Sequence, residues 1–230
     1  MEAQILIDKL KKHDIELNDK QIEQFETYRK LLQEYNKVMN LTAIIETEEI
    51  YVKHFYDSII PALFIDLKGS LLDVGAGAGF PSIPLKILYP ELEVSILEPN
   101  NKRVKFLNVL CQDLGINVNI IEERAEDYIK KSDVKFDFVS ARAVANMQIL
   151  LELCIPFTKV NGYFIALKGS KYEEELKASS NALKELGSSV SEVFTTNLED
   201  ADRAIILIKK DKKTKSKYPR NYGQIKKRPL

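Results

Sequence analysis

The chain has few of the side chains from which disulfide frameworks and metal centres are built. Its 230 residues include two cysteines and two histidines. Cys111 and Cys154 lie in apolar, helix-like stretches, which favours reduced core residues over a disulfide. Because no metal-ligand spacing includes either cysteine, the sequence predicts a protein without a bound metal.

Long hydrophobic runs are missing as well. No apolar stretch of the sequence approaches the ~20 residues of a membrane-spanning helix. The chain starts with MEAQILIDKLKKHD, which is amphipathic and contains acids, unlike the apolar core of an export signal. We therefore expect a cytoplasmic protein with no membrane partner. The hydrophobic content of 45% and the length are sufficient for one packed core with an appendage.

The chain also has no net charge, because it contains 34 basic and 34 acidic residues. These charges are unevenly distributed along the sequence. Residues 209–230 contain ten lysines and arginines against one acid, a net charge of +9, so the remainder carries −9. Most runs of charge are simply solvated. A concentrated basic end on an acidic protein nevertheless suggests an anionic partner, with nucleic acid as the first choice.

What the sequence does have is a glycine loop within residues 71–84, LLDVGAGAGFPSIP. It is typical of a buried strand, a tight loop and a first helical turn. Gly75, Gly77 and Gly79 allow positive φ and a close approach of a ligand to the backbone. Dinucleotide loops read G-x-G-x-x-G. The loop here reads G-x-G-x-G instead, with Asp73 two residues before its first glycine. This pattern resembles the S-adenosylmethionine (SAM) loop of Rossmann-like methyltransferases. Another nucleotide-binding loop and a plain glycine turn are the alternatives.

The first 66 residues predict a helical extension packed on the main domain. Residues 1–13 predict a short amphipathic helix, and Asn18 with Gln21 predicts a capping box that starts a second one. The second helix carries an apolar stripe, most simply explained as core packing. Its members are Ile22, Phe25, Tyr28, Leu32, Tyr35 and Met39.

A third helix is expected from residue 47 to residue 63. It carries His54 and Asp57, which are three residues apart and so could hydrogen-bond on one face. A hydrolytic triad with Ser58 is the weaker reading, because Ser58 diverges from Asp57 around the helix and no nucleophile elbow is present. We expect a structural or substrate-facing role for His54 and Asp57.

From residue 70 onward, strands and helices alternate regularly. Strands are predicted at Leu71–Val74, Val94–Glu98, Val118–Glu122, Phe136–Ser140, Tyr163–Leu167, Val190–Thr195 and Arg203–Ile208. Helices are predicted at Ser82–Tyr89, Lys102–Leu114, Met147–Phe157 and Glu173–Leu186. This alternation predicts a doubly wound α/β fold, with a seven-stranded, mostly parallel sheet. The last two strands are joined by a short connection and should form an antiparallel hairpin.

In such a sheet the ligand lies at the carboxyl ends of the strands. Glu98 ends the second strand, 23 residues beyond Gly75, which suits hydrogen bonds from ribose hydroxyls, although a solvated acid is the alternative. The loop after the third strand, residues 122–127, flanks the adenine in SAM enzymes. Arg142 follows the fourth strand and could hold the methionine carboxylate or a substrate phosphate, with a surface salt bridge as the alternative.

Taken together, these segments resemble the RsmG family, also called glucose-inhibited division protein B, over essentially the whole chain. The matching segments are NLTAI, HFYDS, DVGAGAGFPSIPL, NKRVKFL, RAED, SARA, LKG, KYPRNYG and KKRPL. Ser82 departs from the glycine that many relatives have in FPGIP. Because Ser82 lies in the helix start rather than in the tight turn, we expect the change to be tolerated.

Members of that family use SAM to methylate N7 of a guanine in the small-subunit (16S) ribosomal RNA of bacteria. The resemblance therefore implies the same activity, with the RNA or the small subunit as partner, and a class I methyltransferase fold. By motif position, the family's SAM contacts fall on Gly75, Phe80, Ala125, Glu126 and Arg142. Guanine N7 loses no proton on methylation, so no general base is needed and no catalytic side chain is identified.

We expect a monomer divided into a helical extension (1–66), a SAM-binding domain (67–210) and a basic tail (211–230). The resemblance leaves one alternative of a different class. It is a non-catalytic SAM- or nucleotide-responsive RNA-binding protein acting in ribosome assembly. A methyltransferase of proteins or small molecules is a weaker option, because the basic tail speaks against it.

The C-terminal tail, residues 211–230, places aromatic rings between cations, a pattern suited to phosphates and unpaired bases. Its candidate RNA contacts are Lys217, Tyr218, Arg220, Tyr222, Lys226, Lys227 and Arg228. Pro219, Gly223 and Pro229 oppose a regular helix, so we expect an extended segment beside the SAM site. Truncation after Lys210 should then weaken RNA binding and leave SAM affinity nearly unchanged.

Overall fold

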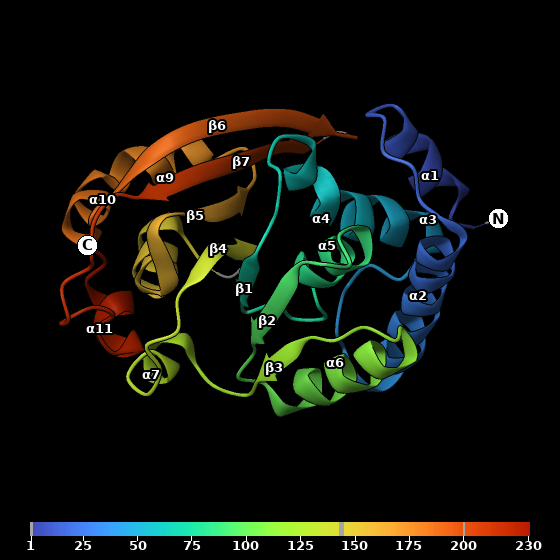
Figure 1. Cartoon of the computed structure of the whole chain (residues 1–230), viewed down its shortest axis with the longest axis horizontal. Coiled ribbons are helices and arrows are strands. Elements are labelled where there is room, and N and C mark those ends of the chain that lie inside the picture. Colours follow the sequence, from blue (N-terminus) through green and yellow to red (C-terminus); the bar gives the residue numbers. More distant parts are fainter. Residues whose placement is uncertain (1, 143–144, 200) are drawn as a thin grey trace.

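A seven-stranded sheet runs through the computed structural model, which describes residues 2–142, 145–199 and 201–230 (Figure 1). The strands are β1 (Ser70–Val74), β2 (Glu93–Leu97), β3 (Asn119–Ile121), β4 (Phe136–Arg142), β5 (Thr158–Lys168), β6 (Ser188–Leu198) and β7 (Ala201–Lys210). Their order is β3-β2-β1-β4-β5-β7-β6. All neighbours pair in parallel except β7, which is antiparallel to β5 and β6. The predicted doubly wound sheet with its terminal hairpin is confirmed.

Helices cover both faces of this sheet, because consecutive side chains of a buried strand point to opposite sides. Leu71 of β1 belongs to one hydrophobic core, whereas the adjacent Leu72 belongs to the other. The α-helices between β1 and β6 are α5 (Ser82–Leu88), α6 (Asn101–Asp113), α7 (Ala125–Tyr128), α8 (Met147–Cys154), α9 (Tyr172–Ala178) and α10 (Ser180–Leu186). The two cysteines, Cys111 and Cys154, are buried and free, as predicted. No helix in the described part of the chain is long and apolar enough to cross a bilayer.

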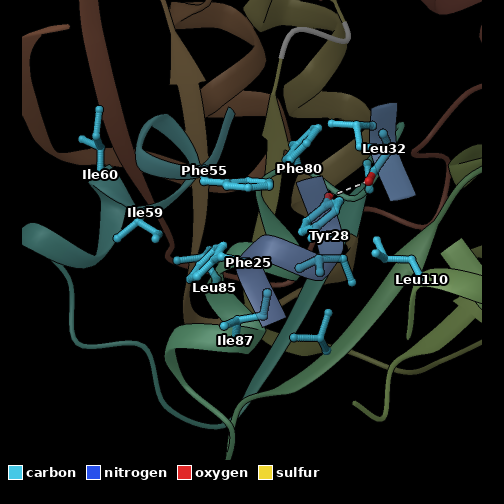
Figure 2. Packing of buried hydrophobic residues seen from close by; sticks show 14 of the residues in the cluster. Phe25, Tyr28, Leu32, Phe55, Ile59, Ile60, Phe80, Leu85, Ile87 and Leu110 are labelled. Atoms are coloured by element: carbon cyan, nitrogen blue, oxygen red, sulfur yellow. Dashed lines mark hydrogen bonds between the residues drawn. The ribbon is translucent and has the colours of Figure 1, made fainter. Parts of the chain in front are cut away.

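The N-terminal helices pack on the first of these cores through α1 (Gln4–Lys11) and α2 (Asp19–Met39). The predicted capping box is present, since Asn18 accepts the Gln21 backbone N–H and the Gln21 side chain accepts that of Asn18. Phe25, Tyr28 and Leu32 of the predicted stripe are fully buried, and Tyr28 lies beside Phe80 of the glycine loop (Figure 2).

Polar side chains of α2 fix the extension to the main domain. Gln21 donates to the Ile87 carbonyl at 2.9 Å, and Gln24 donates to the Leu114 carbonyl at 2.8 Å. The Tyr28 hydroxyl donates to the carbonyl of Ala78 in the glycine loop at 2.6 Å. The extension therefore supports the loop directly.

The predicted third helix is interrupted. It consists of α3 (Thr47–Glu49), a π-helical turn η1 (Ile50–Tyr56), α4 (Asp57–Ile59) and a 3-10 turn η2 (Ile60–Leu63). The Ser58 hydroxyl donates to the His54 carbonyl at 2.6 Å, which competes with the regular helical ladder. The helix predicted over residues 173–186 divides at Ser179 for a similar reason, since its buried hydroxyl donates to the Glu175 carbonyl.

The expected extended tail is wrong in part. Asn221 accepts the Gln224 backbone N–H, and this cap starts a short helix, α11 (Tyr222–Lys227). Pro219 precedes the cap and Pro229 follows the helix, so neither proline interrupts it. The tail packs on the second core, where Tyr218 and Ile225 are buried.

Candidate functional site

Two cavities meet at the carboxyl ends of the parallel strands. The first, here called the glycine-loop cavity, has a volume of about 390 Å³. Its lining comes from the ends of β1 to β4, from α8 and from the tail, and includes Gly75, Gly77, Phe80, Glu98, Arg103, Glu123, Arg124, Ala125, Glu126, Arg142, Leu153 and Tyr222. This is the edge at which the sequence predicted a ligand.

The three glycines of the loop have different roles. Gly75 and Gly77 line the cavity, with φ of 75° and 63°. A Cβ atom on Gly77 would meet nothing within 4 Å, so the space beside it is open. A Cβ atom on Gly79 would lie 2.8 Å from the Tyr28 hydroxyl and 2.6 Å from Ile83. Gly79 thus serves packing against the N-terminal extension and is not among the residues that line the cavity.

Glu98 is placed by the glycine loop that it faces. It is 1% exposed. One carboxylate oxygen accepts the Gly77 backbone N–H at 3.0 Å, and the other accepts that of Asn100 at 3.0 Å. Arg103 lies 3.7 Å from the same carboxylate. Since a carboxylate has about four acceptor sites, Glu98 can accept further hydrogen bonds from a ligand.

Asp73 supports the loop from behind and is not among the lining residues. It is fully buried, and its carboxylate accepts the Ser82 backbone N–H at 3.2 Å and the Ser140 hydroxyl at 3.0 Å. Burial raises the pKa of Asp73 to about 7, against the opposing effect of these hydrogen bonds. The predicted direct contact of Asp73 with a cofactor is therefore replaced by a role in joining β1, β4 and α5.

Arg142 forms a wall that both cavities share. Its side chain is 15% exposed, and it donates to Asp57 at 3.0 Å and to Nδ1 of His54 at 3.4 Å. Its guanidinium also lies 4.8 Å from the centre of the Phe80 ring. Asp57 uses its other oxygen to accept from Arg203 at 2.6 Å. The ion pair that the sequence left as an alternative is present, but it is buried inside the site.

His54 is held as a neutral imidazole. Burial and the neighbouring Arg142 charge lower the pKa of His54 to about 3. Its Nε2 is 2.8 Å from the Thr42 hydroxyl, and its ring stacks on Phe80 at 4.4 Å. The expected hydrogen bond between His54 and Asp57 is replaced by a shared contact with Arg142. His54 does not change charge near neutral pH.

The second cavity, here called the Arg203 cavity, has a volume of about 370 Å³. It lies between the N-terminal extension and the ends of β5 and β7, and its lining includes Lys53, His54, Asp57, Arg142, Lys168, Glu175 and Arg203. Lys168 pairs with Glu175 at 2.6 Å. Four cations against two carboxylates leave this lining positive.

Ala125 and Glu126, the first two residues of α7, line the glycine-loop cavity, which is consistent with the SAM contacts expected from their motif. Their neighbours Glu123 and Arg124 also line the cavity and were missed as individual sites. The Oε2 atom of Glu123 is buried without a hydrogen-bond partner among the described residues. The Glu123 side chain as a whole is 31% exposed and its Oε1 accepts from Lys131 at 2.5 Å, so the sequence gives no signal that separates Glu123 from its solvated neighbours.

The tail separates its predicted RNA contacts into two groups. Lys217, Lys226, Lys227 and Arg228 are exposed. Tyr218 is buried and donates to Glu185 at 3.1 Å, whereas Arg220 pairs with the fully buried Glu152 at 2.6 Å. Tyr218 and Arg220 thus fasten the tail, and the buried Tyr218 ring is not free to stack on a base. Tyr222 lines the glycine-loop cavity.

Comparison with known proteins shows the family to which the chain belongs. The family model described as rRNA small subunit methyltransferase G matches residues 21–206. Proteins named ribosomal RNA small subunit methyltransferase G are similar over the full chain. That of Streptococcus agalactiae serotype III (strain NEM316) is 52% identical, covering 99% of this chain and 97% of that protein. That of Staphylococcus epidermidis strain RP62A is 49% identical, covering 100% and 99%.

Solved structures of distant sequence share the fold. The magnesium protoporphyrin IX methyltransferase of Synechocystis PCC 6803 with bound SAM has a TM-score of 0.58 at 14% identity, covering 79% of this chain and 97% of that one. TrmK of M. capricolum in complex with S-adenosyl-homocysteine has a TM-score of 0.54 at 13% identity, covering 70% of each chain. The sheet is thus that of Rossmann-like class I methyltransferases. By its sequence, the chain belongs to the rRNA small subunit methyltransferase G family.

Proposed function

We propose that the protein uses SAM to methylate N7 of a guanine in bacterial small-subunit (16S) ribosomal RNA. Family membership supports the activity. The observation that carries the site assignment is the Arg142 wall, which the glycine-loop cavity and the Arg203 cavity share. A methyl donor in the first cavity and an acceptor in the second would meet beside this residue. We place the protein in the bacterial cytoplasm as a monomer.

The residues around the glycine-loop cavity fit SAM. Glu98 is oriented by two backbone amides and would accept ribose hydroxyls, and the open space beside Gly77 suits a ligand lying against the backbone. The unsatisfied Glu123 Oε2 calls for a donor, which an amino group of a purine can supply. Phe80, Ala125, Glu126 and Arg142 complete the proposed contacts.

The protein has to align the methyl donor with the guanine N7 that accepts the methyl group. SAM supplies a methyl group that is already activated on a sulfonium, and guanine N7 has a free lone pair and loses no proton. A neutral His54 and an Arg142 fixed by Asp57 suit this task, because neither needs to exchange a proton. Orientation of the reacting groups can by itself lower the barrier by ~7–11 kcal/mol. Arg142 and Phe80 would hold the donor side, and the Arg203 cavity would exclude water from the acceptor.

We assign the Arg203 cavity to the target base. Guanine presents the O6 acceptor beside N7, and the N1–H and N2 donors along its Watson–Crick edge. The Arg203 and Lys168 side chains can donate to O6, and the Glu175 carboxylate can accept from the donor edge. N7 of a paired guanine faces a deep, narrow groove in A-form RNA, so the target base is expected to be unpaired or flipped out.

The exposed cations of the tail are the proposed phosphate contacts. Lys217, Lys226, Lys227 and Arg228 are unburied, and α11 carries the last part of this set next to the glycine-loop cavity. Bound RNA would therefore pass the mouth of the cavity, with Tyr222 at its edge.

The decisive experiment is methyl transfer from labelled SAM to three substrates. Naked 16S RNA, small subunits and whole ribosomes are prepared from cells that lack this enzyme. We expect labelled 7-methylguanosine in at least one of them, recognised by chain cleavage after borohydride and aniline treatment. Label at another atom would overturn the N7 assignment. SAM binding without transfer to any of the three would favour the non-catalytic alternative.

A further inference from the structure

We propose that Tyr222, the first residue of helix α11, forms the wall of the cofactor site at the purine end of SAM. The C-terminal tail then completes the cofactor site in addition to contacting RNA. This inference rests on the proposed function. The motifs of the glycine loop and the strand ends do not include Tyr222.

Strand order fixes which end of the cavity Tyr222 occupies. The cavity lining follows β3, β2, β1 and β4 in that spatial order, with Ala125 after β3, Glu98 after β2 and Arg142 at the end of β4. Neighbouring strands are ~4.8 Å apart, so the ends of β3 and β4 are separated by roughly 14 Å. The Arg124 guanidinium lies 5.8 Å from the centre of the Tyr222 ring, which places Tyr222 at the β3 end.

The methyl group must leave from the opposite end. Arg142 is the residue of the glycine-loop cavity that also lines the Arg203 cavity. The sulfonium therefore belongs beside Arg142, at the end of β4. Glu98 then takes the ribose at β2. The purine is left at β3, between Ala125 and Tyr222. An aromatic ring there offers its face to the purine, and Arg124 over that ring adds a cation–π contact.

The tail is fixed firmly enough to serve as a wall. Arg220 donates to the Glu152 carboxylate through Nε at 2.8 Å, through Nη2 at 2.6 Å and through its backbone N–H at 2.9 Å. Glu152 is fully buried on α8, where an unpaired carboxylate would be costly. Ile225 of α11 is also fully buried, and Gln148 donates to the Leu230 carbonyl at 2.6 Å.

Calorimetric titration with S-adenosylhomocysteine tests the inference. Tyr222→Ala should lower the affinity by about tenfold, whereas Tyr222→Phe should keep it within twofold because the ring is retained. Tyr172→Ala is the matched control, since Tyr172 lies on α9 outside both cavities and should bind normally. Equal affinity of Tyr222→Ala and wild type would overturn the inference. Failure of wild type itself to bind would instead count against the proposed function.

A spectroscopic readout separates direct contact from indirect disturbance. The chain contains no tryptophan, so Tyr222→Trp introduces a single fluorescent reporter. S-adenosylhomocysteine and 5′-methylthioadenosine should both change its emission saturably, whereas methionine should not. Tyr172→Trp should show no change with any of the three. A response to methionine alone, or no response to S-adenosylhomocysteine, would show that Tyr222 does not face the purine.

Discussion

Arg142 makes contacts that no other cation could reproduce. Its two terminal nitrogens reach Asp57 and His54 separately, and its Cζ lies 4.8 Å from the centre of the Phe80 ring. We expect Arg142→Ala to lower kcat/KM for methyl transfer by about 100-fold, a magnitude typical for loss of one positioned donor. The melting temperature of the Arg142→Ala variant should fall only slightly, because Asp57 keeps Arg203 as a partner.

Arg142→Lys should not restore this loss, since an ammonium is a point charge without a planar fork. Steady-state kinetics and thermal melting of both variants check the expectation. Full activity of the lysine variant would mean that charge alone is required at this position.

Gly77 is expected to be needed for the ligand rather than for the fold. Gly77→Val places a side chain in the open space of the cavity and strains a positive φ, at a cost of about 1–2 kcal/mol. Binding of S-adenosylhomocysteine should be abolished while the variant stays folded. Gly115→Val is a matched control, because Gly115 has a φ of 61° and equally open space outside the cavity. Calorimetry that finds normal binding to Gly77→Val would contradict the placement of the cofactor.

Asp73 should make stability depend on pH. Its folded pKa of about 7 lies above the ordinary value of 3.8, so the folded protein holds a proton that the unfolded chain releases. The stabilisation of the folded state by this proton is complete below about pH 4 and is lost as the pH rises to about 7. Asp73→Asn removes this titration.

Urea unfolding of both proteins at pH 4.5 and 7.5 tests the Asp73 expectation. Between pH 4.5 and pH 7.5, the free energy of unfolding of Asp73→Asn should rise by about 3 kcal/mol relative to that of the wild type. Other titrating groups cancel in this difference. A difference that stays constant would show that Asp73 is ionised throughout.

At the scale of elements, α11 changes what removal of the tail should do. The sequence predicted that truncation after Lys210 spares SAM affinity. If the cavity holds SAM as proposed, we expect the opposite, because such a truncation removes Tyr222 from the cavity lining and leaves Glu152 buried without Arg220. Substitution of exposed cations is therefore the cleaner way to test RNA binding.

Replacing Lys226, Lys227 and Arg228 by serine should weaken RNA binding and leave S-adenosylhomocysteine affinity unchanged. Each lost phosphate contact makes the negative slope of log K against log salt shallower by about 0.7–0.9. The loss of three contacts should therefore make it shallower by about 2 to 3. Filter binding across a salt series measures both quantities. The matched control replaces the three exposed lysines of α2, Lys20, Lys30 and Lys37. Equal slopes for the tail variant and the control would remove the tail from the RNA interface.

Elements defined by local chemistry were predictable, and those defined by long-range contacts were not. The strands and the Asn18–Gln21 capping box follow from periodicity and capping chemistry, and the structure confirms them. The π-helical turn and the break at Ser179 coincide with hydroxyls that donate to carbonyls four residues earlier, and periodicity does not register such contacts. The sequence did not predict α11, because its prolines were weighed without the Asn221 cap.

The candidate site follows the same division. The glycine loop, Glu98 and Arg142 come from strand ends that a motif can locate. Arg203 and Tyr222 come from segments folded back against those ends, and their sequence neighbours carry no sign of a cavity. Asp73 and Gly79 were recognised as part of the motif, but the motif does not distinguish a ligand contact from a support beneath it.

For the whole molecule, the site is assembled from three distant parts of the chain. His54 and Asp57 come from the N-terminal extension, Arg142 from the sheet and Tyr222 from the tail. The hydrophobic core that contains α2 also contains β1, so the extension and the sheet are packed as one unit. The division at residues 66 and 210 stays a prediction.

The distribution of charge has a consequence for how the protein meets a polyanion. The tail lies at the end of the long axis opposite the N-terminal helices (Figure 1). Residues 209–230 carry a net charge of +9, and the rest of the chain carries −9. The separation of these charges gives the neutral molecule an electric dipole moment. In the field of RNA it experiences a torque that turns the tail forward and the acidic body away. Encounters with RNA are thus expected to begin at the tail, which contributes Tyr222 to the glycine-loop cavity.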